Sequence, residues 1–427
     1  MIKIYKYGEV ESSEIFSRFE PLSSVEGVVS DIIAKVVDLG DSALYAFEKE
    51  FDKADLSSLE VSASEISDAL LVVGSSFVSI LEEAASNISE YHEAQKREGF
   101  EIKRSSGTVL GQKIIPVEKA GLYVPGGTAA YPSTVLMDAI PAKIAGVSEV
   151  VMVTPPQADG TINPYILAAA HVAGIDRIFK VGGAQAIAAL AYGTETIPKV
   201  DKIVGPGNAY VAEAKKQVFG KVSIDMIAGP SEILVVADGK SNPKYVAADL
   251  LSQAEHDKMA SAVLVTDSME LAGAVSSELE EQIPLLLRSS IARASIDNNG
   301  KIIVADTIDK VIDIANEIAP EHLELCVDDP FALLSAIKHA GSVFLGRDCP
   351  EAVGDYFAGA NHTLPTSGTA RFSSALSVDD FIKKTQYIYY TRPALEEVAA
   401  KIATFAEKEG LTGHAKSVTI RTEENDE

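Results

Sequence analysis

The sequence is short of the features that mark secreted and membrane proteins. Its 427 residues include only two cysteines, Cys326 and Cys349, too few for a disulfide framework and typical of reduced thiols in a cytosol. The longest apolar stretch, residues 69–81, is too short and too rich in glycine and serine to span a bilayer. The first fifteen residues acquire acidic side chains before any apolar segment of signal-peptide length. We therefore expect a cytoplasmic protein.

Positive charge is also scarce. The 37 lysines and arginines are outnumbered by 62 aspartates and glutamates, which gives a net charge of −25. Such a field repels polyphosphates, so nucleic acids and anionic membranes are not expected as partners. A hydrophobic content of 47% with 23% charged residues is typical of a globular protein, and the length predicts two or more domains.

The spacing of apolar residues changes along the chain. In residues 26–51 and 76–98 they recur every three or four positions, which predicts helices. From about residue 120, short apolar runs alternate with helical patterns. These runs are 149–155, 176–183, 201–207 and 232–238, followed by a second series at 261–267, 300–306, 323–329 and 342–346. The alternation predicts two α/β units with parallel strands and crossover helices. After about residue 376 the pattern is helical again.

Three glycine-rich turns lie in the first α/β unit, at residues 121–127, 181–185 and 205–208. Glycine lets the backbone approach a ligand, and the free amides at a helix N-terminus favour phosphate. However, turns between strands and helices need glycine in any case, and Asn208 is a good helix N-cap. None of the three has the spaced G-x-G-x-x-G pattern, so a dinucleotide site and a purely structural role both stay open.

The seven histidines divide into two groups. We interpret three as structural: His92 as a solvated residue on a charged helix, His171 as a core or helix-end residue, and His339 as a residue near a helix C-terminus. The other four, His256, His322, His362 and His414, stand in less ordinary surroundings.

A metal site is one interpretation of this second group. Gln253 and His256 are three residues apart in a helical stretch and therefore share a face. A zinc ion takes nitrogen and oxygen ligands in a roughly tetrahedral array, which His256, His414 and Asp355 could supply together with Gln253. The separations along the chain are long, so scattered polar residues are the alternative.

Glu321 and His322 are adjacent, after Pro320, which disfavours a helical conformation at Ala319. Neighbouring side chains in extended backbone point in opposite directions, so each could serve a different proton transfer. A surface loop is the alternative. Cys349 could act as a nucleophile on an aldehyde, but only Arg347 is nearby to lower its pKa, and we expect no catalytic role for it.

Longer segments are more specific than these single features. They are GLYVPGG, VGGAQAIAALAYGT, GPGNAYVAEAKKQVFG, IAGPSEILVVAD, AEHD, PEHLEL, GDYFAGANHTLPT, TARFSSALSV and EGLTGHAKSV, in this order between about residues 115 and 420. In these segments the sequence resembles the histidinol dehydrogenase family, and the resemblance covers nearly the whole chain, the first hundred residues less distinctively.

The resemblance implies an α/β fold with two Rossmann-like domains of incomplete type and a homodimer whose active sites are shared between subunits. It implies oxidation of L-histidinol to L-histidine by two NAD⁺, through bound histidinaldehyde, with zinc as a second cofactor. The implied residues are Glu321 and His322 for catalysis; Gln253, His256, Asp355 and His414 for zinc; Tyr123, Gln185 and Asn208 for NAD; and Ser231, Gln253, His256, His322, Asp355, His362, Glu409 and His414 for the substrate.

A division into domains follows from these patterns taken together. We expect an N-terminal arm at 1–20, a larger discontinuous α/β domain at 21–123 and 233–375, and a second α/β domain at 124–232 that carries the NAD-binding turns. Residues 376–427 are expected to form a helical dimerisation segment.

Two other functions are compatible with parts of this pattern. An enzyme of the same fold could oxidise a different small alcohol, but Glu409 and His414, which the resemblance assigns to recognition of the substrate, are both present. A metabolite-binding protein could have two α/β lobes without chemistry, but it would not need the Glu321–His322 pair.

Overall fold

The computed structural model describes residues 1–18, 25–126 and 130–423, so Gly127 and the boundary expected near residue 20 lie outside the described residues. The chain forms two compact units. Unit 1 comprises Met1–Gln95 and Val117–Phe381, and unit 2 comprises Lys96–Pro116 and Ile382–Glu427. Unit 1 contains two parallel sheets and most of the helices, which confirms the predicted α/β class.

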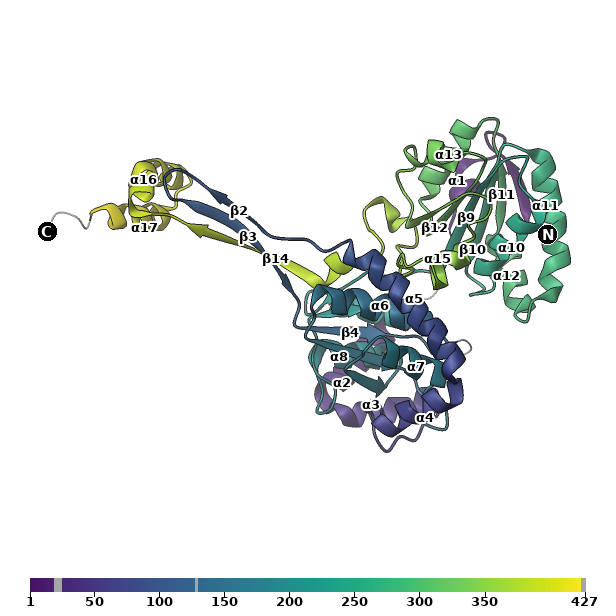
Figure 1. Cartoon of the computed structure of the whole chain (residues 1–427), viewed down its shortest axis with the longest axis horizontal. Coiled ribbons are helices and arrows are strands. Elements are labelled where there is room, and N and C mark those ends of the chain that lie inside the picture. Colours follow the sequence, from purple (N-terminus) through teal and green to yellow (C-terminus); the bar gives the residue numbers. More distant parts are fainter. Residues whose placement is uncertain (19–24, 127–129, 424–427) are drawn as a thin grey trace. The chain divides into compact units, whose positions relative to one another are not determined.

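The first sheet of unit 1 has six parallel strands. Their order is β1 (Lys3–Lys6), β11 (Lys301–Val304), β10 (Ser261–Thr266), β9 (Glu232–Ala237), β12 (His322–Cys326) and β13 (Ser342–Leu345). The helices α10 (Pro243–Ala254), α11 (Met269–Gln282) and α12 (Ser289–Asn299) cover one face, and α1 (Ser12–Phe16) and α13 (Ile308–Ile318) the other (Figure 1). Both faces are covered, which is why β9 and β12 are buried throughout.

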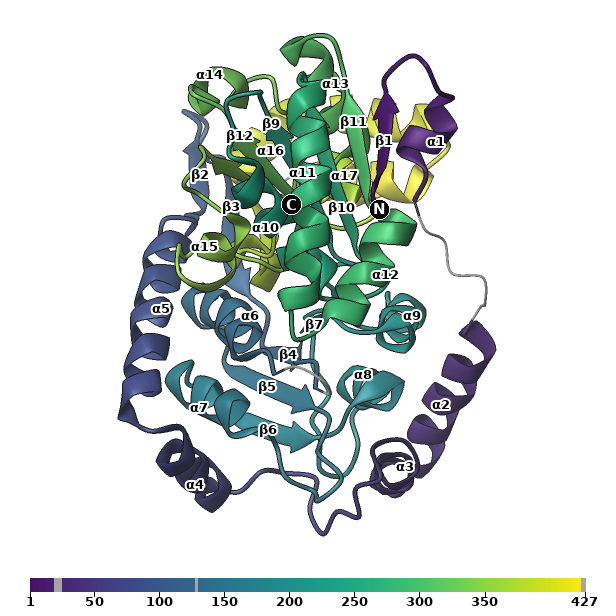
Figure 2. The ribbon, with the colours of Figure 1, turned by 90° about the vertical axis from the view of Figure 1, so that its right-hand side faces the viewer.

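The second sheet of unit 1 has five parallel strands. Their order is β6 (Arg177–Lys180), β5 (Glu149–Thr154), β4 (Lys119–Tyr123), β7 (Lys202–Val204) and β8 (Ser223–Ile224). One face packs against α2 (Glu26–Leu39), α3 (Asp41–Phe47), α8 (Gly183–Tyr192) and α9 (Ala209–Val218), and the other against α4 (Ala63–Val73), α5 (Ser75–Glu93), α6 (Pro132–Ala145) and α7 (Pro164–Val172). Figure 2 shows β5 and β6 with α7 and α8 beside them.

These contacts group the N-terminal half differently from the division expected from the sequence. The helices α2 and α4 contact α8 and α7, which cover the five-stranded sheet, whereas residues 21–123 were expected in one domain with 233–375. The strand β1, within the expected arm, pairs with β11 at an edge of the six-stranded sheet. Amphipathic helices show which face is apolar but not which sheet will cover it, so sequence patterns alone do not make this assignment.

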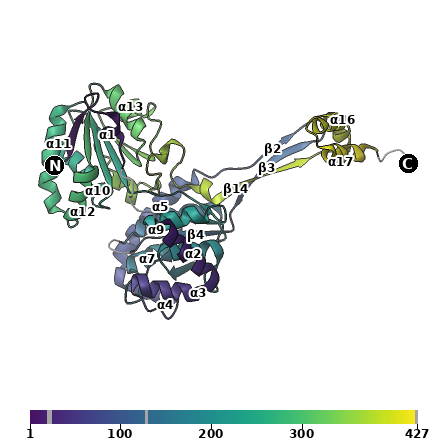
Figure 3. The same ribbon diagram turned by 180° about the vertical axis from the view of Figure 1, so that it is seen from behind.

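Unit 2 consists of an antiparallel sheet and two helices. The sheet order is β14 (Ile382–Tyr389), β3 (Val109–Pro116) and β2 (Phe100–Lys103), followed along the chain by α16 (Arg392–Lys408) and α17 (Thr412–Glu423) (Figure 3). The expectation of helix throughout the segment after residue 376 is wrong for β14. Its β-branched and aromatic residues pair along the whole length of β3, and residues of this type favour strands.

Short elements complete the described chain. They are the π-helical turn η1 (Glu48–Asp52), the 3₁₀ turns η2 (Ile283–Leu285), η3 (Thr369–Arg371) and η4 (Val378–Phe381), and the helices α14 (Pro330–Leu334) and α15 (Glu351–Tyr356). Among the described residues no single helix is long and apolar enough to cross a membrane, although α4 and α5, bent by 104° at their junction, pass such a test as a pair.

Candidate active site

The residues of unit 1 predicted for catalysis, zinc binding and substrate binding gather near the edge where the strands of the six-stranded sheet begin. His322 is the first residue of β12, Ser231 directly precedes β9, and Gln253 lies in the last turn of α10. Because a crossover helix runs back against the direction of its strands, the C-terminal end of α10 returns to the edge where β10 starts. Residues far apart in the sequence therefore meet at this edge.

His322 is the central side chain of this cluster. Its Nδ1–H donates to the carbonyl oxygen of Glu232 at 3.1 Å, and a carbonyl can only accept. Its Nε2 therefore faces Asp355, whose Oδ1 is 3.6 Å away, and Nε2 has no hydrogen-bond partner among the described residues. Burial lowers the pKa of His322, but the carboxylates of Glu321 and Asp355 outweigh this effect and raise the pKa to about 10.

The backbone of Glu232, which holds His322, also holds Glu321. Oε2 of Glu321 accepts the backbone N–H of Glu232 at 2.8 Å and lies 3.7 Å from Nδ1 of His322. Burial raises the pKa of Glu321 to about 8. The helix α13 ends at Ile318, before the position at which Pro320 disfavours helix, and Ala319 adopts a left-handed conformation with φ 49°. Glu321 and His322 thus lie in a buried strand start rather than in a surface loop.

Asp355 faces Nε2 of His322, and His362 and His256 lie near enough to Asp355 and His322 to interact with them electrostatically. Nδ1 of His362 is 3.1 Å from the carbonyl oxygen of Asp355, and its Nε2 is 3.3 Å from Oγ1 of Thr134. Burial lowers the pKa of both His362 and His256. Although burial raises the pKa of Asp355, the nearby imidazoles of His322 and His362 outweigh this effect and lower it to about 2. Neutral imidazoles and an ionised carboxylate are therefore available at one place.

Gln253 is held by a residue that the sequence analysis missed. Its Nε2 donates to Oε1 of Glu351, and Glu351 also accepts from the hydroxyl of Ser252 at 2.8 Å. The Oε1 of Gln253 is buried without a hydrogen-bond partner in the described structure. Glu351 therefore sets which atom of the amide faces the cluster. Its position four residues before Asp355, on one face of a helix, is the sequence signal that could have identified it.

The remaining predicted residues belong to unit 2. Glu409 follows α16 as its C-cap, and His414 lies in α17, both exposed within the described chain. Their roles stay predictions.

His92 corrects one expectation. It was expected to be solvated on a charged helix, but it is fully buried. Its Nδ1 is 2.8 Å from the carbonyl oxygen of Ile88, and its Nε2 is 3.3 Å from the side-chain nitrogen of Asn361. Asn361 in turn donates to the carbonyl oxygen of Met137. His92 thus helps to position the residue next to His362, which no local pattern of charge could indicate.

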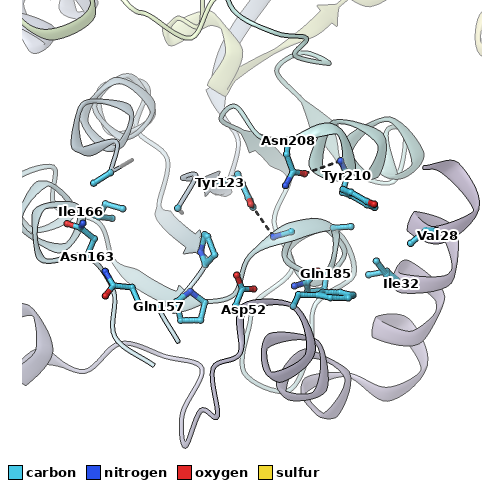
Figure 4. Close-up of a pocket in the computed structure, with 17 residues that line it drawn as sticks. Val28, Ile32, Asp52, Tyr123, Gln157, Asn163, Ile166, Gln185, Asn208 and Tyr210 are labelled. Carbon is cyan, nitrogen blue, oxygen red and sulfur yellow. Dashed lines mark hydrogen bonds between the residues drawn. The ribbon is translucent and has the colours of Figure 1, made fainter. Parts of the chain in front are cut away.

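The three glycine-rich turns surround a cavity at the carboxyl edge of the five-stranded sheet. The cavity measures about 580 Å³, and Tyr123, Gln185 and Asn208 all line it (Figure 4). The hydroxyl of Tyr123 accepts the backbone N–H of Gly183 at 3.1 Å. Asn208 caps α9 by accepting from the N–H groups of Tyr210 and Val211. The N-cap and ligand-binding interpretations of Asn208 are therefore compatible.

A buried ion pair holds the turn at 205–208. Lys215 pairs with Asp225 and also donates to the carbonyl oxygen of Gly205 at 3.0 Å, while the N–H of Gly205 donates to Asp225 at 2.8 Å.

Removing the side chain of Lys215 leaves the buried carboxylate of Asp225 unpaired. We expect Lys215→Ala to lower the free energy of unfolding by about 3–5 kcal/mol, measured by urea denaturation. Lys216→Ala, at an exposed neighbouring position, is the control. If both substitutions lowered the free energy of unfolding by the same small amount, the expectation would be contradicted.

Comparison with known proteins identifies the family. The family model described as histidinol dehydrogenase matches residues 18–422. Histidinol dehydrogenase of Clostridium acetobutylicum is 52% identical over 426 residues, 99% of each chain, and that of Geobacillus kaustophilus is 55% identical over 93% of this chain and 94% of the relative. The chain belongs to the histidinol dehydrogenase family. The crystal structure of histidinol dehydrogenase from Elizabethkingia anophelis, 40% identical, has a TM-score of 0.94 and covers 100% of this chain and 99% of its own.

Histidinol dehydrogenase membership confirms the resemblance seen in the sequence, and the cluster offers donors that suit a metal ion. His322, Glu351 and Asp355 each place one donor atom within 4.8 Å of the others, and of these only Asp355 was predicted as a ligand. The buried, unpartnered Oε1 of Gln253 adds a neutral oxygen donor, and the low pKa of His256 keeps a nitrogen lone pair available. These oxygen and nitrogen donors fit a divalent cation such as zinc.

Proposed function

We propose that the chain oxidises L-histidinol to L-histidine in histidine biosynthesis, using two NAD⁺ in succession and keeping histidinaldehyde bound between the two steps. The observation that carries the proposal is the buried pair Glu321 and His322 at the edge of a cluster of unpartnered donor atoms. Membership of the histidinol dehydrogenase family supports the choice of substrate.

His322 is proposed as the base in both oxidations. With Nδ1 bound to the carbonyl oxygen of Glu232, Nε2 is the atom that accepts the alcohol proton as hydride leaves the carbinol carbon for NAD⁺. The aldehyde must then add water, and Glu321 is proposed to take a proton from that water. The protonated His322 returns its proton to the aldehyde oxygen as this water adds, so it can accept a proton again when the hydrate loses its hydride to the second NAD⁺.

The proposed zinc ligands are Gln253, His256 and Asp355, with His414 from unit 2 of a second subunit. A bound zinc ion would hold nitrogen donors of histidinol, fix the carbinol carbon, and offset the charge of Asp355, which in turn lowers the pKa of His322. Glu351 is proposed as a positioning residue, because it turns the Oε1 of Gln253 toward the cluster.

The other substrate contacts are proposed on the same basis. Ser231 directly precedes β9, and His362 follows α15 and contacts the carbonyl oxygen of Asp355. Glu409 is proposed to recognise the imidazole or the amine of histidinol, because opposite charge contributes both affinity and selection. NAD is proposed to occupy the cavity lined by Tyr123, Gln185 and Asn208.

A homodimer with shared active sites is supported by the composition of unit 2. Its own hydrophobic cluster among the described residues consists of Ala403, Ala406 and Ala415, too little to bury the faces of α16 and α17. Large apolar side chains stay exposed on this unit, among them Ile388 at 71% and Phe405 at 70%. A second copy of the chain would cover them and would bring Glu409 and His414 to the site. The cytoplasmic location stays a prediction.

The stoichiometry of the reaction tests the proposed activity. With purified dimer, zinc and excess NAD⁺, we expect two NADH for each L-histidinol consumed, followed at 340 nm, and histidine as the product by chromatography. Absence of turnover with histidinol would refute the substrate, and one NADH with release of the aldehyde would refute the second oxidation. Turnover of another small alcohol at a higher kcat/KM would favour the alternative substrate.

A further inference from the structure

Among the described residues that line the cavity proposed for NAD, one is acidic and none is basic. Asp52 is the charged residue among the described residues that line it, and no lysine or arginine lines it. Figure 4 shows Asp52 between Gln157 and Gln185, on the side of the cavity opposite Asn208. An NADP pocket needs a cation for the 2′-phosphate, whereas a carboxylate accepts hydrogen bonds from ribose hydroxyls and repels that phosphate.

The position of Asp52 is set by a buried network. It ends the π-helical turn η1, which starts at Glu48, and Lys53 after it is left-handed with φ 61°. Glu48 is fully buried, and its Oε1 accepts from Nε2 of Gln185 at 2.9 Å and from the N–H of Gly182 at 3.3 Å. Burial and the neighbouring Asp52 raise the pKa of Glu48 to about 8. Burial raises the pKa of Asp52 as well, and its hydrogen bond with Glu48 lowers it. Glu48 is fully buried, so the half-buried Asp52 is the member of the pair whose carboxyl group lines the cavity.

The surroundings indicate which part of the dinucleotide lies there. The exposed apolar residues Phe51 and Tyr210, 46% and 43% exposed, lie among the lining residues with Val28, and flat aromatic side chains of this kind stack on a base. None of the proposed catalytic or zinc-binding residues lines the cavity among the described residues. The nicotinamide must lie against the substrate carbon, so the cavity takes the adenosine half.

We propose that Asp52 is the residue that selects NAD⁺ over NADP⁺, by accepting hydrogen bonds from the adenosine ribose hydroxyls and excluding a 2′-phosphate. This inference rests on the proposed NAD-dependent function. It adds a selecting residue from η1, a segment far in the sequence from the three glycine-rich turns.

Two experiments test the proposal. For Asp52→Asn, we expect kcat/KM with NADP⁺ to rise about tenfold or more, because a like charge at the phosphate is removed, and kcat/KM with NAD⁺ to fall about three- to tenfold. Asp55→Asn is the matched control, because Asp55 is exposed, pairs with Lys49 and does not line the cavity. The proposal would be overturned if the ratio of kcat/KM with NAD⁺ to kcat/KM with NADP⁺ were the same in Asp52→Asn as in the native enzyme and in Asp55→Asn.

The second experiment uses the unaltered dimer and no turnover. Calorimetric titration with AMP and with adenosine 2′,5′-bisphosphate should give at least about tenfold tighter binding of AMP. Equal or tighter binding of the bisphosphate would overturn the role of Asp52. Because binding is measured without histidinol, failure of the proposed oxidation and failure of this inference give different results.

Discussion

Replacement of His322 by asparagine is expected to lower kcat for NADH formation from L-histidinol by about two to four orders of magnitude. The asparagine amide can still donate to the carbonyl oxygen of Glu232, so the bond that fixes the native imidazole is preserved. It cannot accept a proton at the position of Nε2. The alcohol proton then has no acceptor as hydride leaves, and both oxidations slow.

The matched control is His171→Asn, at an exposed position in the last turn of α7, which should leave kcat unchanged. Binding of histidinol by His322→Asn, measured by calorimetry, should change far less than kcat. Thermal melting of the two variants separates a chemical defect from a folding defect. A kcat for His322→Asn within about threefold of the native value would show that another group is the base.

The regular part of the fold was predictable because both faces of each sheet in unit 1 are covered. Strands such as β5 and β9 are therefore continuous apolar runs, which the sequence shows directly. The strands of unit 2 were not predictable in this way. β2 is exposed throughout and β14 almost throughout, so neither has the alternation of a half-buried strand, and only pairing with β3 identifies them.

The parts of the candidate site that form short patterns in the sequence were predictable. The adjacency of Glu321 and His322 and the spacing of Gln253 and His256 are visible in the sequence. Glu351 was missed because its role depends on a contact with a side chain 98 residues away. His92 was misread for a similar reason, since its partner Asn361 comes from a different segment. Contacts of this kind depend on tertiary packing, which local patterns do not encode.

Removal of the bound metal is the other change with a large expected effect. Dialysis of the purified dimer against a chelator should lower kcat/KM by at least about a hundredfold, because the carbinol carbon is then no longer fixed beside the nicotinamide. Readdition of Zn²⁺ should restore it, and elemental analysis should find one zinc for each chain. Protein that contains no metal by the same analysis and still turns over histidinol would contradict the zinc-site proposal.

The positioning role of Glu351 predicts that its loss weakens zinc binding but leaves an activity that added zinc restores. With Glu351→Ala, the Nε2 of Gln253 loses its acceptor, and the amide can turn its Oε1 away from the metal. We expect zinc affinity to fall about 10- to 100-fold, as for other residues that orient metal ligands, with kcat recovered at high zinc concentration. The control Glu281→Ala, at an exposed position on α11, should bind zinc normally. Recovery by zinc distinguishes a positioning residue from a catalytic one, because loss of the base His322 cannot be restored by adding metal.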